Sequence, residues 1–313
     1  MATVLITGGT GLIGSALAGE LLSRSYDVII LTRSPGKYSN TSRLSYAKWD
    51  IEKQTIDVDA ITKADYIIHL AGEGIADKRW TMKRKRQIAE SRIKSSALLV
   101  KALRENLNNI KAVVSASGIG WYGNSTLTLP GEKGTGKNPF EENDPAAEDF
   151  LGTTCKEWEA SIEPVVSFGK RLVKFRTGIV LSKEGGAIKE FQKPLRFGLA
   201  TILGNGKQIM SWIHIDDLVR LYIYAIEREK MAGVYNAVAP RPVSNKKLII
   251  QLAKTMRGKF YIPIFVPSFI LRIVFGELSI EVLKSATVSC KKIKREGYVF
   301  LYPSLIAALH HVK

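Results

Sequence analysis

Residues 3–14 read TVLITGGTGLIG, and this stretch decides the fold. Residues 3–7 are apolar and β-branched, which predicts a short buried strand, and residues 12–23 carry leucines at helical spacing. A Gly-rich turn from strand to helix lets the backbone approach a pyrophosphate, whose charge the helix N-terminus stabilises. An ordinary strand-to-helix turn is the alternative, but the position directly after a clear strand favours dinucleotide binding. The residues expected to contact the dinucleotide are Gly8, Thr10, Gly11, Leu12, Ile13 and Gly14.

The alternation of strand and helix continues as far as Gly178. Further strands are expected at residues 27–31, 45–49, 66–70, 111–115 and 171–176, and helices at residues 58–63, 81–106 and 149–162. Strands that alternate with helices at this spacing are typical of a doubly wound parallel sheet. The sequence therefore predicts an α/β protein with a Rossmann fold.

The order changes after Gly178. Residues 202–213 contain a Gly-Asn-Gly turn at 204–206, which predicts a hairpin or a tight loop, and a helix at 218–227 precedes a strand at 233–236 that returns to the sheet. Beyond residue 240, prolines break the chain into short helices, and residues 131–139 are expected to be a loop. We expect a Rossmann domain of residues 1–178 plus 214–238, and a smaller C-terminal α/β substrate lobe of residues 179–213 plus 239–313.

The end of the second expected strand bears on the choice of cofactor. NAD-binding proteins usually place Asp or Glu there for the ribose hydroxyls, whereas arginine favours a 2′-phosphate. Here Arg33 and Ser34 follow the strand and no acid does, so NADP(H) is the expected cofactor; a solvated loop arginine is the alternative. Asp50 follows the third strand and is expected to face the adenine. The chain is expected to pass the pyrophosphate and ribose at Leu70, Ala71 and Gly72.

The charge of the chain indicates an anionic partner. The 313 residues include 46 Lys and Arg against 29 Asp and Glu, a net charge of +17. Basic runs at residues 78–86 and 291–295 are interpreted as solvated helix faces, because no recognised nucleic-acid-binding motif accompanies them. We therefore expect a small-molecule substrate and no nucleic acid, and keep a basic nucleic-acid or membrane-surface binder as a hypothesis that rests on charge alone.

Other sequence features concern the compartment. Cys155 and Cys290 are far apart and the four histidines form no cluster, so neither a disulfide nor a metal site is expected. No signal peptide is visible at the N-terminus. The most apolar later segment, residues 261–275, is interrupted by prolines and an arginine, so we expect no membrane contact. A cytoplasmic protein, monomeric or homodimeric, is the expectation.

Separated motifs resemble one family, the atypical extended short-chain dehydrogenases/reductases of the epimerase family protein group. The matching segments are residues 8–14, 69–75, 79–81, 91–92, 115–123, 211–218 and 235–240. The resemblance covers almost the whole chain, including the C-terminal domain of unknown function that the group carries. It implies an NADP-binding Rossmann fold and a sugar-nucleotide epimerase or carbonyl reductase ancestry, with a sugar nucleotide as one candidate substrate.

The catalytic motif of that family is incomplete here. Active short-chain enzymes use Tyr-x-x-x-Lys on one helix face, the Tyr as acid or base and the Lys to lower its pKa and hold the ribose. If Lys156 is that lysine, Gly152 stands at the tyrosine position and can transfer no proton. Lys156 is expected to bind the ribose, a surface lysine being the alternative. An NADP-binding sensor or scaffold without catalysis is accordingly the alternative function.

Other polar residues near the expected site could replace the missing catalytic tyrosine or bind the substrate. Ser117 and Tyr122 lie at the end of the fifth expected Rossmann strand and are the candidate catalytic residues, although Tyr122 can instead pack or orient substrate. Glu73 and Arg92 are expected to orient a substrate carboxylate, phosphate or hydroxyl, or else to form a structural ion pair. His214 is expected at the substrate, with fixing of the next helix N-terminus as the alternative.

Overall fold

The structure is a computed structural model that describes residues 1–125 and 138–311. Most of the loop expected at residues 131–139 lies outside the described residues. Both cysteines are free and buried. In the described part of the chain, no helix is long and apolar enough to cross a bilayer.

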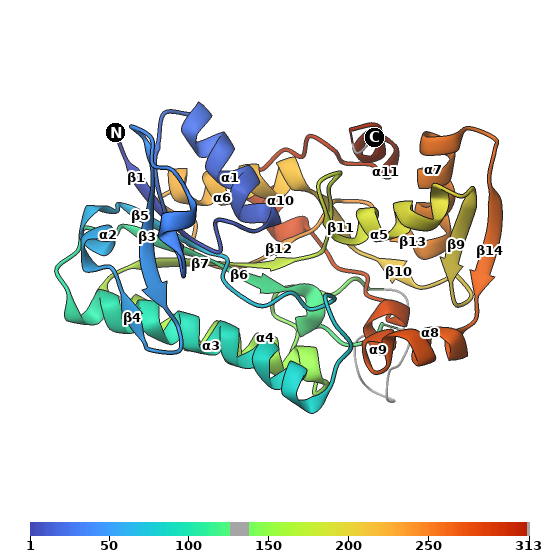
Figure 1. The fold of residues 1–313 in the computed structure, drawn as a ribbon, viewed down its shortest axis with the longest axis horizontal. Helices are drawn as coiled ribbons and strands as arrows, with labels where there is room; N and C mark the ends of the chain where they lie inside the picture. Colours follow the sequence, from blue (N-terminus) through green and yellow to red (C-terminus); the bar gives the residue numbers. More distant parts are fainter. Residues whose placement is uncertain (126–137, 312–313) are drawn as a thin grey trace.

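A central eight-stranded sheet has the order β12-β7-β6-β5-β1-β2-β3-β4 (Figure 1). All neighbouring strands are parallel except β4, which runs antiparallel to β3. The chain starts at the middle of the sheet, moves to one edge, and crosses back to build the other half, which confirms the expected doubly wound fold. The strands are β1 Thr3–Thr7, β2 Asp27–Thr32, β3 Leu44–Asp50, β4 Thr55–Ile56, β5 Tyr66–His69, β6 Ala112–Gly118, β7 Arg171–Thr177 and β12 Gly233–Ala237.

Helices cover both faces of the sheet, because side chains alternate between the faces along each strand. In β1, Val4 and Ile6 pack in the core under α1 and α6, whereas Leu5 packs in the core under α2 and α3. Figure 1 shows α1 and α6 on one side of the sheet and α3 with α4 on the other. These helices are α1 Leu12–Ser23, α2 Val58–Lys63, α3 Met82–Glu105, α4 Phe150–Ile162 and α6 Ile215–Glu227.

The remaining strands form three two-stranded sheets. They are β8 Ile179–Leu181 with β11 Trp212–His214, β9 Leu199–Leu203 with β14 Ile262–Val266, and β10 Ile209–Met210 with β13 Val243–Ser244. The Gly-Asn-Gly turn at 204–206 is a tight loop and not a hairpin, because β9 pairs with β14 whereas β10 pairs with β13. The remaining helices are α5 Gly186–Leu195, α7 Asn245–Arg257, α8 Ser268–Phe275, α9 Leu278–Leu283, α10 Lys291–Arg295 and α11 Leu305–His310.

The C-terminal third contributes to two different cores. Buried side chains of α5, β9, α7 and α11 form a cluster of their own, which also contains Trp212. The segment 286–300, which includes α10, instead packs into the core beneath α1 and α6, through Val288, Ile293 and Tyr298 among others. The chain therefore returns to the Rossmann core at residues 286–300 and then re-enters the small-lobe cluster through α11.

Candidate functional site

The turn between β1 and α1 can accept only glycine at two positions. Gly8 has a φ of +69°, and a Cβ there would lie 2.9 Å from the carbonyl carbon and oxygen of Leu70. A Cβ on Gly14 would lie 2.3 Å from the carbonyl oxygen of Gly8. Both contacts are far shorter than van der Waals contact, so the sequence brings β1, the end of β5 and the start of α1 together by omitting side chains.

The N-terminus of α1 has no internal cap. Gly11 occupies the N-cap position, has no side chain to accept a hydrogen bond, and no acidic residue stands in the first turn of this 12-residue helix. The amide of Gly11 donates to the carbonyl of Gly8 at 3.1 Å, which tightens the turn. The amides of the first helical turn have no intrahelical acceptor and, with the helix dipole, suit an anionic ligand.

The ends of β2 and β3 offer different groups. Arg33 is exposed, and its guanidinium has no hydrogen-bond or ion-pair partner among the described residues. Ser34 precedes a short 3₁₀ turn, Pro35–Lys37, and its side chain does not cap it. Asp50 Oδ1 accepts hydrogen bonds from the amides of Glu52 and Lys53, both at 3.0 Å. Arg33 is therefore free to meet a phosphate, whereas one oxygen of Asp50 already holds the turn after β3.

A buried network fixes the segment 70–72 beside the Gly-rich turn. Thr7 Oγ1 accepts hydrogen bonds from the amides of Leu70 and Ala71, at 3.1 and 3.2 Å, and lies 2.7 Å from His69 Nδ1. Because both acceptor sites of the hydroxyl are used, its proton goes to Nδ1, and Nε2–H of His69 faces Ser96 Oγ at 3.1 Å. Burial lowers the pKa of His69 to about 3, so the ring is neutral.

Arg92 and Glu73 do not pair with each other. Glu73 Oε2 accepts from Arg84 Nη1 at 3.0 Å, which realises the structural alternative with a different arginine. Arg92 is buried, donates from Nη1 to the carbonyl of Ile88 at 2.8 Å, and has no carboxylate partner among the described residues. Its guanidinium lies over the ring of Trp158, with Cζ 5.0 Å from the centroid.

The surroundings of Arg92 place its charge at the carboxyl end of β5. A Cβ on Gly72 would lie 3.1 Å from Arg92 Cζ, so the guanidinium sits directly against the backbone of this glycine. Burial lowers the pKa of Arg92, and the nearby Cys155 and Glu73 partly offset that effect. An arginine stays charged in proteins, so Arg92 is a buried cation with spare N–H donors next to the expected cofactor segment.

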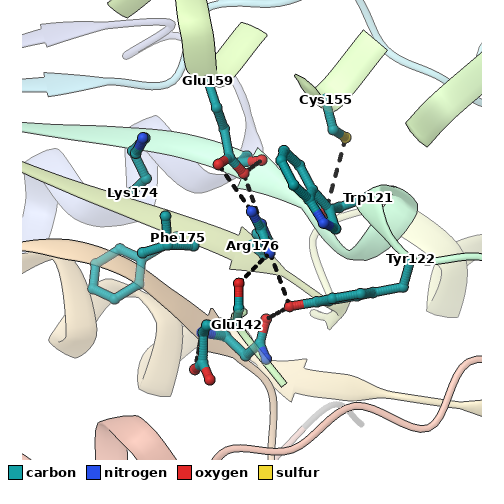
Figure 2. Close-up of polar contacts among 12 residues, drawn as sticks. Trp121, Tyr122, Glu142, Cys155, Glu159, Lys174, Phe175 and Arg176 are labelled. Carbon is teal, nitrogen blue, oxygen red and sulfur yellow. Dashed lines mark hydrogen bonds and ion pairs between the residues drawn. The ribbon is translucent and has the colours of Figure 1, made fainter. Parts of the chain in front are cut away.

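Ser117 belongs to a buried ion-pair network. Its hydroxyl donates to Glu159 Oε1 at 2.7 Å, and both oxygens of Glu159 accept from Arg176, at 2.8 and 3.1 Å. Figure 2 shows Arg176 at the centre of the network, between Glu159 and Tyr122. Trp121 covers the guanidinium, whose Cζ lies 3.5 Å from the ring centroid. The Ser117 hydroxyl is therefore committed to a structural carboxylate.

Tyr122 lies in the same network and is fully buried. Its hydroxyl donates to Asn236 Oδ1 at 2.7 Å and accepts from Arg176 Nη1 at 3.2 Å, while its ring stacks on Phe140. Burial, only partly offset by Arg176, raises the pKa of Tyr122 to about 12. The expected role of Tyr122 as an acid loses its geometric basis, because a substrate has no access to the phenol.

The inward face of α4 carries neither tyrosine nor lysine. A Cβ on Gly152 would lie 2.1 Å from the carbonyl oxygen of Ala147, so this glycine packs against the preceding loop. Lys156 is exposed. Towards the end of β6, α4 instead turns Leu151, against Gly120, and Cys155, whose Sγ lies 3.6 Å from the carbonyl oxygen of Gly118. One helical turn on, it turns Glu159 towards Ser117. Burial raises the pKa of Cys155 to about 11, so its thiol is protonated.

His214 caps α6 and so fixes the start of that helix, whereas the cap expected from the sequence was Asp216 or Asp217. Nδ1 accepts from the amide of Asp216 at 3.2 Å, and the ring lies against Tyr302 with centroids 4.1 Å apart. Burial lowers the pKa of His214, so the ring is neutral near pH 7. Its Nε2 is buried and has no partner within the described residues. Across residues 1–125 and 138–311, no group of three His, Cys, Asp or Glu side chains lies close enough together to hold a metal ion.

Sequence reasoning did not identify Glu159, Arg176 and Asn236 as members of the buried ion-pair network. Arg176 had a usable signal, since a cation in a central strand that is covered on both faces needs a buried partner. Glu159 lies on the face of α4 that carries Cys155, one helical turn on. Nothing local to Asn236 indicates that Tyr122, 114 residues earlier, is its partner.

Known proteins that resemble this chain belong to a family of dinucleotide-dependent enzymes. A model of the "NAD dependent epimerase/dehydratase family" matches residues 4–148 and 182–237, and a "Domain of unknown function (DUF1731)" matches residues 266–312. An epimerase family protein of Staphylococcus haemolyticus is 34% identical over 97% of both chains. One of Mycobacterium leprae is 32% identical over 99% of this chain and 95% of its own.

Solved structures agree as well. A human epimerase family protein crystallised with NADPH is similar at 28% identity and a TM-score of 0.83, over 99% of this chain and 98% of the human one. The UDP-N-acetylglucosamine 4-epimerase of Bacillus cereus, 19% identical with a TM-score of 0.75 over 100% of this chain and 98% of its own, shares the fold. By its family match, its relatives and its doubly wound sheet, the chain belongs to the NAD dependent epimerase/dehydratase family.

Proposed function

We propose that this chain binds NADP(H) across the carboxyl ends of β1, β2 and β5. The observation that carries the proposal is the β1–α1 turn, where the backbone excludes side chains at Gly8 and Gly14 and leaves the N-terminus of α1 uncapped. This turn suits the pyrophosphate. Arg33, free and exposed at the end of β2, suits the 2′-phosphate, and the human relative crystallised with NADPH supports the same choice.

We propose that the substrate is a small anionic molecule, with a sugar nucleotide as the leading candidate. Arg92 supports this, because it is a buried cation beside Gly72 that has no carboxylate partner among the described residues. A ligand carboxylate or phosphate would neutralise it and use its free N–H donors. Glu73 is held by Arg84 and is half-exposed, so it can contact a substrate hydroxyl through its second oxygen.

The proposed reaction is hydride transfer at a carbonyl or alcohol carbon, as in a carbonyl reductase or epimerase. A bound nicotinamide supplies the hydride chemistry. The chain supplies binding and orientation, through the α1 N-terminus and Arg92. Ser117 and Tyr122 are held in the buried network and α4 presents Leu151 and Cys155, so water is the proposed proton carrier in place of a tyrosine.

A second function is favoured by one observation: the inward face of α4 carries Leu151, Cys155 and the ion-paired Glu159, and neither tyrosine nor lysine. A helix that carries neither the acid nor the lysine of active relatives suits a protein that binds NADP(H) without turning it over. In this alternative the chain is a sensor or scaffold whose state depends on the cofactor.

Cofactor choice is tested by titrating NADPH and NADH against tryptophan fluorescence. We expect NADPH to bind more tightly, and Arg33→Ala to weaken NADPH about tenfold or more, since a charge-assisted hydrogen bond contributes about 1.5–3 kcal/mol. NADH affinity should not change in that variant. Lys101→Ala, an exposed cation on α3, is the matched control. Equal affinities for the two cofactors, or an effect of Lys101→Ala as large as that of Arg33→Ala, would refute the assignment.

Enzyme and sensor are separated by the absorbance of bound NADPH during incubation with sugar nucleotides, aldehydes and ketones. Oxidation by an anionic substrate, with a raised KM in Arg92→Met, supports the enzyme. Arg92→Lys, which keeps the charge but loses the planar fork, should recover part of the affinity. NADPH binding without oxidation by any of them supports the sensor.

A further inference from the structure

The outer end of the small lobe exposes a group of large apolar side chains, here called the apolar edge. It comprises Phe197, Phe260, Ile262, Phe265, Phe269 and Ile273. Phe197 and Phe260 are each 82% exposed and Ile273 is 68% exposed. Isolated exposed apolar residues are ordinary, but several on adjacent elements mark an interaction surface.

The fold brings these residues to one edge. β14 pairs with β9 on one side only, and in Figure 1 it forms the outermost strand of the small lobe, with α8 next to it in the chain at the same end. The amide of Ile262 donates to the carbonyl of Gly198 at 2.8 Å, which places the loop of Phe197 beside that of Phe260. In α8, Leu271 is buried and Phe275 packs against an internal cluster, whereas the other apolar side chains of the helix are exposed: Phe269, Ile270, Ile273 and Val274.

The segment that carries most of the apolar edge has charges of one sign, and the acidic Glu277 that directly follows it pairs with Lys85. Residues 231–276 contain seven Lys and Arg and not one Asp or Glu. Arg257 lies between the segments of Phe197 and Phe260, where its guanidinium donates to the carbonyls of Phe260 and Arg196 at 3.4 and 3.5 Å. Lys246 Nζ lies 5.8 Å from the ring of Phe265. The +17 of the chain is therefore concentrated in part where apolar side chains are exposed.

Exposed apolar side chains together with an excess of cations indicate what binds to the apolar edge. A second copy of the chain would bring one cationic edge against another, and this like-charge contact opposes association. Protruding Phe and Ile side chains with flanking Lys and Arg are instead the composition of a surface that lies on anionic lipid. We propose that the apolar edge docks the protein on the surface of a bilayer that contains anionic lipids.

The proposal replaces the expectation of no membrane contact, and it is independent of the cofactor assignment. Figure 1 shows β14 at the opposite end of the molecule from β1 and α1. A protein held by β14 and α8 therefore keeps its Gly-rich turn away from the lipid. Rings of Phe197 and Phe260 would enter the headgroup region, whereas Lys259 and Arg272 would remain at the level of the phosphates.

The test is flotation of the full chain with vesicles at 0.15 M salt. Vesicles of phosphatidylcholine alone are compared with vesicles that contain about one third phosphatidylglycerol. We expect binding to the anionic vesicles only. Lys259→Ala with Arg272→Ala should lower the partition coefficient about 25-fold, since each cation contributes about fivefold. Phe260→Ser with Ile273→Ser should abolish binding by removing the apolar insertion.

Matched controls use exposed residues elsewhere. Leu107→Ser, at a leucine that is 92% exposed, controls for loss of an apolar side chain, and Lys101→Ala controls for loss of a cation. Both should bind vesicles like the wild type, and unchanged thermal melting should show that the variants fold. Absence of binding to the anionic vesicles overturns the proposal. So does equal binding by Phe260→Ser with Ile273→Ser, or a wild-type dimer that these substitutions dissociate.

Discussion

Replacing Glu159 by leucine is expected to lower the free energy of unfolding by about 3–5 kcal/mol, the cost of leaving a buried charge without its partner. Arg176, whose side chain is 3% exposed, would lose two charge-assisted hydrogen bonds and could not be hydrated. Ser117 would also lose its acceptor. Among the described residues, the carbonyl of Glu142 and the hydroxyl of Tyr122 would remain as hydrogen-bond partners of the guanidinium, at 3.0 and 3.2 Å.

The assay is urea unfolding followed by circular dichroism, with Glu159→Leu, Arg176→Met and the double variant. The double variant removes both charges, so it should be more stable than Glu159→Leu alone, although the residual polar groups lose Arg176. NADPH affinity of each folded variant is measured beside it and should change little. A cost of less than about 1 kcal/mol for Glu159→Leu would refute the structural role that we assign to the pair.

Three further predictions concern His69, Gly14 and Tyr122. Burial lowers the pKa of His69 to about 3, against about 6.5 in the unfolded chain. Its contribution to the free energy of unfolding is therefore complete above pH 6.5 and falls by up to about 1.4 kcal/mol per pH unit below it. In urea titrations, His69→Asn should flatten the dependence of the free energy of unfolding on pH between pH 7.5 and 5.5. Gly14→Ala should abolish NADPH binding or unfold the chain, since its Cβ would lie 2.3 Å from Gly8 O; normal affinity in calorimetry would contradict this. Tyr122→Phe should cost about 1–3 kcal/mol in thermal melting by unpairing buried polar groups, and loss of turnover at full stability would restore its role as an acid.

The Rossmann half of the fold was readable from the sequence because its signals are local. The apolar run at residues 3–7, the glycine spacing and the leucines of α1 lie within one βα unit. The return of a strand at residues 233–236 to the sheet was also predicted, whereas its place beside β7 comes from the structure. In contrast, the packing of residues 286–300 beneath α1 and α6 depends on contacts with elements more than 250 residues earlier, such as Leu17, and no local pattern encodes it.

The candidate site was only partly readable for the same reason. Gly8 and Gly14 could be identified because both belong to one local strand-to-helix motif, and in the structure a Cβ at either position would clash with backbone atoms. Partner choice does not follow from residue type: Glu73 pairs with Arg84 rather than Arg92. Tyr122 looked available because its burial comes from Asn236 and Phe140, which lie on distant parts of the chain.

The central claim is that the β1–α1 turn and Arg33 together hold NADP(H). A crystal structure of the chain grown with NADPH tests it most directly. The account predicts the pyrophosphate at the amides that begin α1, after Gly11, and the 2′-phosphate within hydrogen-bonding distance of the Arg33 guanidinium. An adenosine ribose bound with its 2′-phosphate directed away from Arg33, or a dinucleotide bound elsewhere on the molecule, would contradict it.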